Sequence, residues 1–455
     1  MSNENQTELG TLLRLAWPMM LTQLFIMGTG FLDTAMAGHY SKVDLAGVAM
    51  AGNVLWPAFM LLGGVSMALT PIVSQLRGAG NTGDSGVRIR QGLWLTVLTS
   101  TLLVLVLLNA RVFFDFFKVE LAIITIAMDY LHAAVWGAPA LMFYVALRNV
   151  CDGLGKTQPA MFIAGAVLPL NALLNYVFIF GKFGFPQLGG VGCGWATAIV
   201  LWTQLGAMMF VIRRPFFRAS GLFERFDWPH FDGMLGIARI GVPIGFTVFI
   251  GMVVYSMIGL YIGRLGVNDF AAHSIAGNLN WLTYVIPLGL GAAASIRVGF
   301  YTGANDLPMA RSAAAIAYRF ALVYGVAVSV LVVVFRTQLV GVYTSDPEVI
   351  SIAVTLMLFI AVYQIFDDTQ AVAVGALRGY KDTLVPASLE LLGYWLIALP
   401  VGYAIANGWG PFEARGVYGY WTGLTLGICV VAIANGTRLW LTSRNDERVQ
   451  RLAAT

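Results

Sequence analysis

The chain has 455 residues, of which 58% are hydrophobic and 11% are charged, and its mean hydropathy is +0.76. About a quarter of the residues in a soluble globular protein are charged. This composition therefore excludes a soluble protein and indicates a polytopic membrane protein. The formal net charge of +4 says little about partners by itself, and we expect no nucleic-acid partner.

Twelve stretches are apolar enough to cross a bilayer, for which a helix needs about 20 mostly apolar residues. The sequence therefore predicts an all-α fold, in which no connection is long enough to hold a soluble domain. The predicted spans lie near residues 11–37, 45–71, 91–110, 121–147, 159–181, 190–212, 234–261, 270–296, 312–335, 349–377, 384–407 and 416–441.

Positive charge is unevenly distributed between alternate loops. If both termini lie in the cytoplasm, 20 of the 27 Lys and Arg residues fall on the inner side. Inner loops of membrane proteins carry an excess of Lys and Arg. We therefore expect a multi-pass protein with both termini inside.

The second half of the chain repeats the first at a shift of 225 residues. Pro18 is matched by Pro243, Asp44 by Asp269, and the run 51–53 by an identical Ala-Gly-Asn at 276–278. Each half holds six predicted spans, so both halves are expected to insert with the same orientation. We predict two six-helix bundles, 1–212 and 234–455, joined by a cytoplasmic linker at 213–233. Parallel repeats of this kind suit alternating access around a cavity between the halves.

One acidic residue in the first predicted span is a candidate ligand for a cation. A charged Asp inside the membrane is costly, so such residues are usually functional. The repeat mate of Asp33 is Ile258, so the duplicated scaffold does not demand a charge there. Asn171 and Asn175 lie four residues apart in the fifth span and share one helix face. They are predicted either to form a polar pocket with Asp33 or to hold helices together.

The tenth predicted span carries two adjacent acids, Asp367 and Asp368, near its middle. Adjacent residues of a helix point about 100° apart. One carboxylate can therefore face a cavity while the other packs inside the bundle. Tyr363 lies one turn before Asp367. Glu390 in the next span is predicted to be either a third member of this cluster or an end residue that extends to the interface.

No signature of an enzyme or of an ATP-driven pump is present. Residues 153–157 resemble the end of a phosphate-binding loop, but Val150 stands where the first Gly of that motif is required. An intramembrane enzyme with Asp367 and Asp368 as a dyad is disfavoured, because neighbouring helix positions diverge. Cys151, Cys193 and Cys429 lack metal-ligand or redox spacing. We predict no enzymatic activity and no cofactor.

Four stretches together resemble the multidrug and toxic compound extrusion (MATE) transporters, in particular the NorM branch. They are 31–38, 188–194, 292–299 and 375–382, and the resemblance extends over nearly the whole chain. It implies two six-helix bundles and antiport of cationic amphipathic drugs and dyes against inward Na⁺ or H⁺. It also implies that Asp33, with the two asparagines, forms one cation site. Asp367, with Tyr363, would belong to a second.

The chain departs from this branch at one position. NorM-type proteins often carry a Glu in the seventh helix after a Gly-x-Pro, and here the corresponding residue is Gly251. Asp368 or Glu390 could replace the missing ligand, or coupling could depend on Asp33. Losing a hard oxygen ligand weakens the case for Na⁺ more than for H⁺, although Asp33 and Asp367 stay candidate Na⁺ ligands.

The sequence therefore predicts a monomeric exporter of organic cations in a bacterial inner membrane, driven by H⁺ or Na⁺. We expect it to contact membrane lipid on its outer surface. The alternative is a flippase for a lipid-linked precursor or another exporter of the same superfamily. An anionic headgroup would call for a basic cavity lining, whereas the charges inside the predicted spans are mainly acidic.

Overall fold

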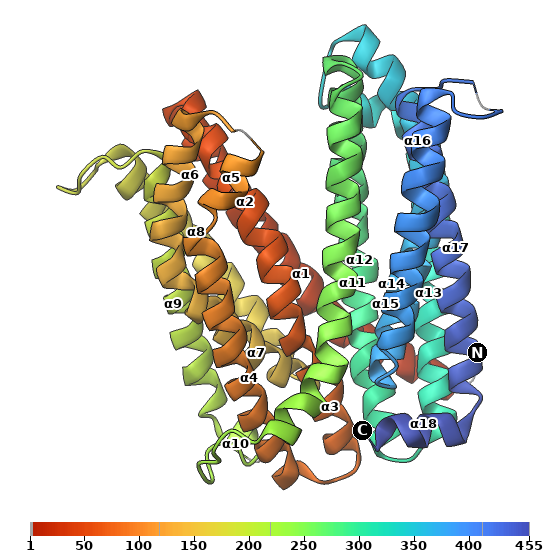
Figure 1. Ribbon diagram of the computed structural model, residues 1–455. Helices are drawn as coiled ribbons and strands as arrows, with labels where there is room; N and C mark the ends of the chain where they lie inside the picture. The colour runs from red at the N-terminus through yellow and green to blue at the C-terminus, as the bar shows by residue number, and fades with distance from the viewer. Residues whose placement is uncertain (1–2, 118, 219, 412, 455) are drawn as a thin grey trace. The chain divides into compact units, whose positions relative to one another are not determined.

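The computed structural model describes residues 3–117, 119–218, 220–411 and 413–454, and these ranges contain helices and no β-strand (Figure 1). Twelve helical segments within them are long and apolar enough to cross a membrane. The predicted all-α class and number of spans are confirmed. Several helices extend beyond the predicted spans, as α13 (Leu307–Gly341) does, because polar ends continue the helix past its apolar centre.

The bounds of the remaining helices follow the chain in order. They are α1 (Asn3–Tyr40), α2 (Lys42–Gly63), α3 (Leu69–Gly78), α4 (Thr82–Leu108), α5 (Arg111–Phe116), α6 (Leu121–Ala134), α7 (Ala138–Gly153), α8 (Gln158–Phe180), α9 (Gly190–Ile212), α10 (Pro215–Arg218), α11 (Phe231–Gly263), α12 (Val267–Gly303), α14 (Pro347–Gly379), α15 (Leu384–Leu392), α16 (Leu399–Asn407), α17 (Val417–Ser443) and α18 (Asp446–Ala453).

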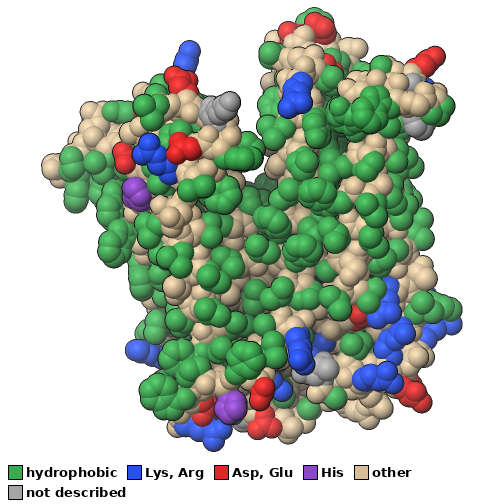
Figure 2. Space-filling model, viewed as in Figure 1, with side chains coloured by type: hydrophobic (Ala, Val, Ile, Leu, Met, Phe, Trp, Pro, Cys, Tyr) green, Lys and Arg blue, Asp and Glu red, His purple; other side chains and the backbone are tan. Residues whose placement is uncertain are grey.

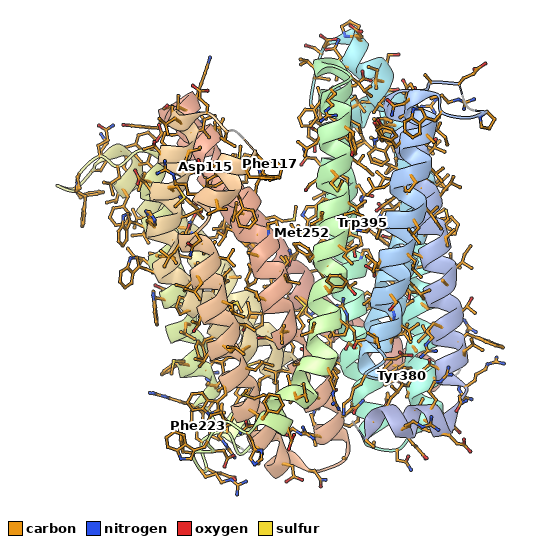
Figure 3. The ribbon with its side chains drawn as sticks, viewed as in Figure 1. Asp115, Phe117, Phe223, Met252, Tyr380 and Trp395 are labelled. Carbon is orange, nitrogen blue, oxygen red and sulfur yellow. The ribbon has the colours of Figure 1, made fainter. Side chains whose placement is uncertain are left out.

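The outward surfaces of the helices are apolar. On α4, Leu98, Leu102 and Leu105 are about half exposed and recur every three or four residues. Figure 2 shows hydrophobic side chains over the visible middle of the helices and charged side chains gathered at their ends. Connecting residues such as Asp115, Phe117 and Phe223 lie outside the spanning segments (Figure 3). This distribution fits helices surrounded by lipid.

The chain divides into two compact units. One is Trp17–Phe246; the other is Met1–Ala16 together with Thr247–Thr455. Helices α1 and α11 therefore each have residues in both units. The expected bundle boundaries, 1–212 and 234–455, stay a prediction.

The start of α1 is anchored within the second of these units by a buried ion pair. Glu8 is only 3% exposed and accepts hydrogen bonds from Arg297 Nε at 2.7 Å and Nη2 at 2.6 Å. The hydroxyl of Tyr301 donates a further bond to Glu8 at 2.8 Å. Fork-shaped pairs of Arg and carboxylate are among the stronger charge-assisted bonds, so this segment is held firmly to α12.

The start of α11 is anchored within the other unit by apolar packing. Ile237, Ile240 and Ile244 pack against Val65 and Leu95. The segment that precedes α11 is held to α4 by charge. Arg90 Nε donates to Asp227 at 2.7 Å, and Gln91 and Trp94 donate to backbone oxygens of the same segment.

Helix α14 is fixed at its start and along its length, which positions the acids it carries. Asp346 caps its N-terminus by accepting from the backbone amides of Glu348 and Val349 at 2.9 and 3.2 Å. Gly375 packs directly on the backbone of Gly291 in α12, and a Cβ at either glycine would collide with the facing helix. Small residues allow such close packing of membrane helices.

Candidate functional site

The seven predicted site residues fall into two separate groups, one in each compact unit. Asp33, Asn171 and Asn175 lie in the unit 17–246, whereas Tyr363, Asp367, Asp368 and Glu390 lie in the unit that contains residues 247–455. The two groups are described separately.

In the unit 17–246, two asparagine side chains of α8 bind the carboxylate of Asp33 on α1. Asn175 Nδ2 donates to Asp33 Oδ1 at 2.6 Å, and Asn171 Nδ2 donates to the same oxygen at 3.1 Å. Asn175 Nδ2 also lies 3.2 Å from Asn171 Oδ1, so one amide contacts both neighbours. Both asparagines are fully buried, and Asp33 is half-buried. We name this group the Asp33 site.

Several oxygens of the Asp33 site remain available. Asp33 Oδ2 accepts neither amide bond. Asn175 Oδ1 is buried and has no hydrogen-bond partner among the residues the structure describes, and the Thr197 hydroxyl lies beside the Asp33 carboxylate. Carboxylate, amide and hydroxyl oxygens are the atoms that bind hard cations. The equivalent position in the other unit, Ile258, is fully buried in an apolar cluster.

In the other unit, Asp368 points into the helix packing around α14. It is 0% exposed, and its Oδ1 accepts from Gln364 Nε2 at 2.6 Å. Gln364 in turn accepts from Thr283 of α12 at 2.8 Å, and Tyr324 of α13 donates to the Thr283 carbonyl at 2.9 Å. Asp368 Oδ2 is buried without a partner among the described residues, facing Gly325.

Asp367 faces a different set of side chains. It is 8% exposed and lies beside Asn280 of α12, whose Oδ1 is buried without a described partner. Tyr363 and Tyr394 both interact electrostatically with its carboxylate. The two adjacent acids therefore have separate neighbours. We name Tyr363, Asp367, Asp368 and Glu390 together the Asp367 site.

Glu390 is buried rather than extended to an interface. It is 5% exposed, and Gln370 of α14 donates to it at 2.6 Å. Arg378, also on α14, interacts electrostatically with Glu390 and compensates part of its charge. A π-helical turn, Gly393–Ala398, begins three residues later and carries Tyr394. Such turns are rare and are frequent at functional sites.

Several polar neighbours of these acids are not predicted from the sequence. Around the Asp33 site they are Thr197 and the buried Tyr130; around the Asp367 site they are Asn280, Thr283 and Gln370. Gln370 lies three residues after Asp367 in an otherwise apolar run, and this spacing could have predicted that it lies near the acids. Nothing in the sequence places Thr197 of α9 near Asp33, because that contact depends on tertiary packing.

Gly251 lies in open surroundings, and a Cβ built there would meet no atom within 4 Å. No group of three or more His, Cys, Asp or Glu that could hold a metal ion occurs in the described part of the chain. A cation in either site would therefore depend on amide, hydroxyl or backbone oxygens as well as on carboxylates.

Comparison with known families reproduces the internal repeat. A family model described as MatE matches residues 18–177 and 243–404. The two matched stretches begin 225 residues apart, which is the shift found within the sequence itself. Each stretch includes one of the two acid groups: Asp33, or Asp367 with Asp368 and Glu390.

Curated bacterial proteins are similar over nearly the full length. The chain is 40% identical to the multidrug resistance protein PmpM of Pseudomonas aeruginosa, covering 98% of this chain and 95% of that protein. It is 37% identical to the multidrug resistance protein MdtK of Proteus mirabilis, with 97% of each covered. The multidrug resistance protein NorM of Vibrio cholerae is 36% identical, with 98% of each covered.

Solved structures share the fold at lower sequence identity. The eukaryotic MATE transporter AtDTX14 superposes with a TM-score of 0.86 at 23% identity, covering 99% of both chains. The MATE transporter VcmN of Vibrio cholerae in its bent form gives a TM-score of 0.85 at 18% identity, covering 98% of this chain and 100% of VcmN.

Proposed function

The chain belongs to the MatE family, a family of transporters rather than enzymes, and on that premise we propose that it exports organic cations and dyes in exchange for inward H⁺ or Na⁺. The relatives named above are multidrug resistance proteins, and multidrug efflux is accordingly the activity of this membrane protein. The expected absence of enzymatic activity agrees with the family.

The observation that carries the proposed exchange is the type of partner that the acids have. Within the described part of the chain, Asp33 and Asp368 accept hydrogen bonds from neutral amides and from no Arg or Lys side chain. An amide stabilises a carboxylate without cancelling its charge. A membrane-embedded negative charge that remains uncompensated attracts a cation or a proton. Competition between the coupling ion and a cationic drug for this charge would produce antiport.

We assign the residues as follows. Asp33, held by Asn171 and Asn175, binds the coupling cation in one unit. Asp367 beside Tyr363 is the exchanging acid of the other unit, because its side-chain partner is the Asn280 amide and its carboxylate, unlike that of Asp368, is not completely buried. Asp368 and Glu390 support it. Asp33 and Asp367 would be the Na⁺ ligands if Na⁺ is used. We favour H⁺, since Gly251 offers no oxygen ligand and a proton needs only one carboxylate.

The same proposal includes the topology. Both termini face the cytoplasm of a bacterial inner membrane, because the Lys and Arg residues then follow the positive-inside rule. Residues 1–212 and 234–455 act as two bundles, and 213–233 is the cytoplasmic linker. The protein works as a monomer.

The test is efflux of a cationic dye from proteoliposomes, driven separately by a pH gradient and by a Na⁺ gradient. Asp33→Asn and Asp367→Asn should each abolish driven efflux. Asp115→Asn is the matched control, because Asp115 is exposed and lies outside the spans. Full efflux in both membrane variants would contradict the mechanism. Efflux driven only by Na⁺ would overturn our preference for H⁺.

A further inference from the structure

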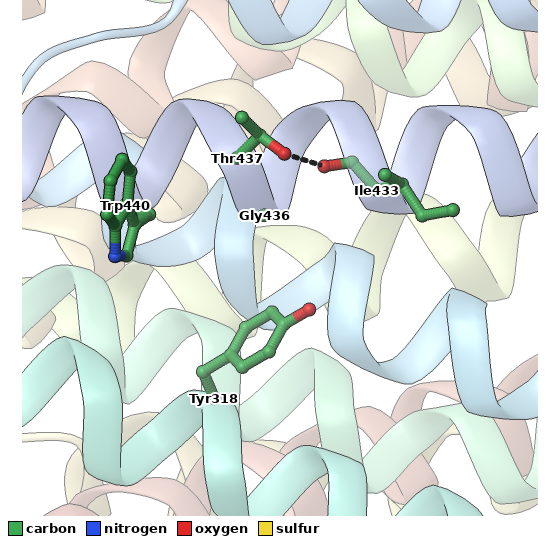
Figure 4. Close-up of a pocket in the computed structure, with 5 residues that line it drawn as sticks. All are labelled: Tyr318, Ile433, Gly436, Thr437 and Trp440. Carbon is green, nitrogen blue, oxygen red and sulfur yellow. Dashed lines mark hydrogen bonds between the residues drawn. The ribbon is translucent and has the colours of Figure 1, made fainter.

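A groove on the surface of the unit that contains residues 247–455 has no assigned role. It lies between α13 and α17, is lined by Tyr318, Ile433, Gly436, Thr437 and Trp440, and has a volume of about 380 Å³ (Figure 4). It shares no residue with the Asp33 site or the Asp367 site. We propose that this groove, the α13–α17 groove, binds an anionic phospholipid of the cytoplasmic leaflet.

The walls of the groove are suited to an acyl chain. Ile433 is 62% exposed and Trp440 is 53% exposed, so the α17 wall is an open apolar surface. The Tyr318 side chain packs closely over Gly436, since a Cβ at this glycine would lie only 3.0 Å from the Tyr318 hydroxyl. Figure 4 shows Tyr318 extending from α13 toward this glycine.

The apolar surface continues along α17 beyond the groove. Leu426 and Val430 are each nearly half exposed. Leu426, Val430 and Ile433 recur at intervals of four and three residues, and Trp440 follows seven residues later, two helical turns on, so all four lie near one face of α17. From Leu426 to Trp440 this stripe is about 21 Å long, at about 1.5 Å per residue. One leaflet of the hydrocarbon core is about 15 Å thick. An acyl chain can therefore lie along the stripe.

Two of the three polar side chains that line the groove have no hydrogen-bond partner among the described residues. Neither the Tyr318 hydroxyl nor the Trp440 indole nitrogen bonds to another described residue. Thr437 already donates to the Ile433 carbonyl at 2.8 Å. Indole offers only a donor, and a tyrosine hydroxyl can donate or accept. Ester carbonyl and phosphate oxygens of a phospholipid are acceptors that match them.

A basic side chain, that of Arg444, lies beside the groove at the proposed cytoplasmic surface. The guanidinium of Arg444 lies 4.5 Å from the Trp440 ring centroid, and Arg444 immediately follows the last residue of the span, Ser443. Arg444 is exposed and has no carboxylate partner within the described ranges. Nearby Arg311 is instead paired with Asp446 at 3.2 Å. Arg444 is therefore an unpaired charge beside the groove among the described residues.

These features together select the occupant. Aromatic and basic residues at the end of a span lie at the level of the lipid headgroups. Basic residues there attract anionic lipids of the cytoplasmic leaflet. A cationic drug would be repelled by Arg444, and a zwitterionic lipid would gain less from it. The assignment depends on the proposed inward orientation of the C-terminus, but not on the coupling ion or the drugs exported.

The test uses the purified full-length protein in detergent with two photoreactive lipids. Phosphatidylglycerol and phosphatidylcholine, each with a diazirine in one acyl chain, are added and irradiated, and the labelled peptides are identified by mass spectrometry. We expect phosphatidylglycerol to label α13 and α17 around the groove more than phosphatidylcholine does. Equal labelling by both lipids would mean ordinary boundary lipid and would overturn the proposal.

The variants separate charge from shape. One arginine contributes about 1 kcal/mol to anionic lipid binding, so Arg444→Gln should lower the preference for phosphatidylglycerol about five-fold. Arg444→Lys should keep most of it. Arg451→Gln is the control, because Arg451 is also exposed and lies on α18. Equal effects of Arg444→Gln and Arg451→Gln would contradict a defined site.

Filling the groove should reduce labelling by both lipids. Gly436→Leu places a side chain against Tyr318, whereas the control Gly206→Leu adds the same bulk on α9, where a Cβ meets nothing within 4 Å. Tyr318→Phe removes only the hydroxyl and keeps the proposal testable if Gly436→Leu misfolds. Unchanged labelling in Tyr318→Phe and in folded Gly436→Leu would overturn the site.

Discussion

The Asp33 site and the Asp367 site both hold acidic side chains inside spanning helices, but they differ in the number of acids and in how exposed those acids are. The Asp33 site has one acid, half-buried, whose single bonded oxygen is held by two buried amides. The Asp367 site has three acids that are 0–8% exposed. In both, the bonds that the structure shows to these carboxylates come from amide side chains.

Some acids elsewhere in the chain are instead paired with arginine, which neutralises their charge. Glu8 is paired with Arg297, and Asp382 accepts from Arg438 Nε at 2.7 Å. Those carboxylates have their charge cancelled within the fold and serve to hold helix ends in place. An amide partner fixes a carboxylate in position but does not neutralise its charge. That charge can then be neutralised by a coupling ion or a cationic drug that binds and dissociates. The comparison teaches that a carboxylate paired with an arginine is spent on anchoring the fold, whereas one held only by amides keeps its charge.

The largest effect is expected for Asp33→Asn, which tests whether the Asp33 carboxylate binds the exchanged cation. Contacts to a charged group are worth about 1.5–3 kcal/mol, and every 1.4 kcal/mol is a factor of ten. Cation affinity should therefore fall about ten-fold to a hundred-fold, and driven dye efflux should fall with it. Thermal stability in detergent should not fall, because Asn fits the same space. A variant that binds dye as well as the wild type would refute the assignment of Asp33.

The Asp367 site should respond differently, because Asp368 is part of the packing. Asp368→Ala leaves Gln364 Nε2 buried without its acceptor, which costs about 1–3 kcal/mol of unfolding free energy. A drop in the thermal midpoint measures this cost. The double variant Asp368→Ala/Gln364→Leu should recover part of it. The exposed Asp115→Ala should shift stability by less than about 0.5 kcal/mol. No loss in Asp368→Ala would indicate that Asp368 is not structural.

How far the sequence predicts these sites depends on the range of each contact. The number of spans, the repeat and the acids follow from composition and from registers within one helix. The pair Asn171 and Asn175 was predictable, because residues four apart share a face. By contrast, the partners Thr283, Asn280 and Thr197 come from other helices. Their approach is set by packing, such as that of Gly291 on Gly375, which no local pattern encodes.

Within the Asp33 site, the two amides should contribute unequally. The Asn175 bond to Asp33 is 2.6 Å long and the Asn171 bond is 3.1 Å. A charge-assisted bond lost in Asn175→Ala should lower cation affinity about ten-fold, and Asn171→Ala should lower it less. Competition binding of a fluorescent dye against H⁺ and Na⁺ measures both. If Asn171→Ala is the more damaging variant, the amides act mainly as contacts between helices.

The smallest expected effect concerns the ligand that the Asp367 site lacks. Gly251→Glu adds a carboxylate to the same unit at a position where a Cβ would meet no atom within 4 Å. A partly solvated carboxylate contributes up to about 1 kcal/mol to an ion contact, so Na⁺-driven efflux should rise by at most about five-fold relative to H⁺-driven efflux. Gly251→Gln controls for the added bulk, since it carries no charge. If both variants change Na⁺-driven efflux and H⁺-driven efflux by the same factor, the absence of an acid at position 251 does not determine which ion is used.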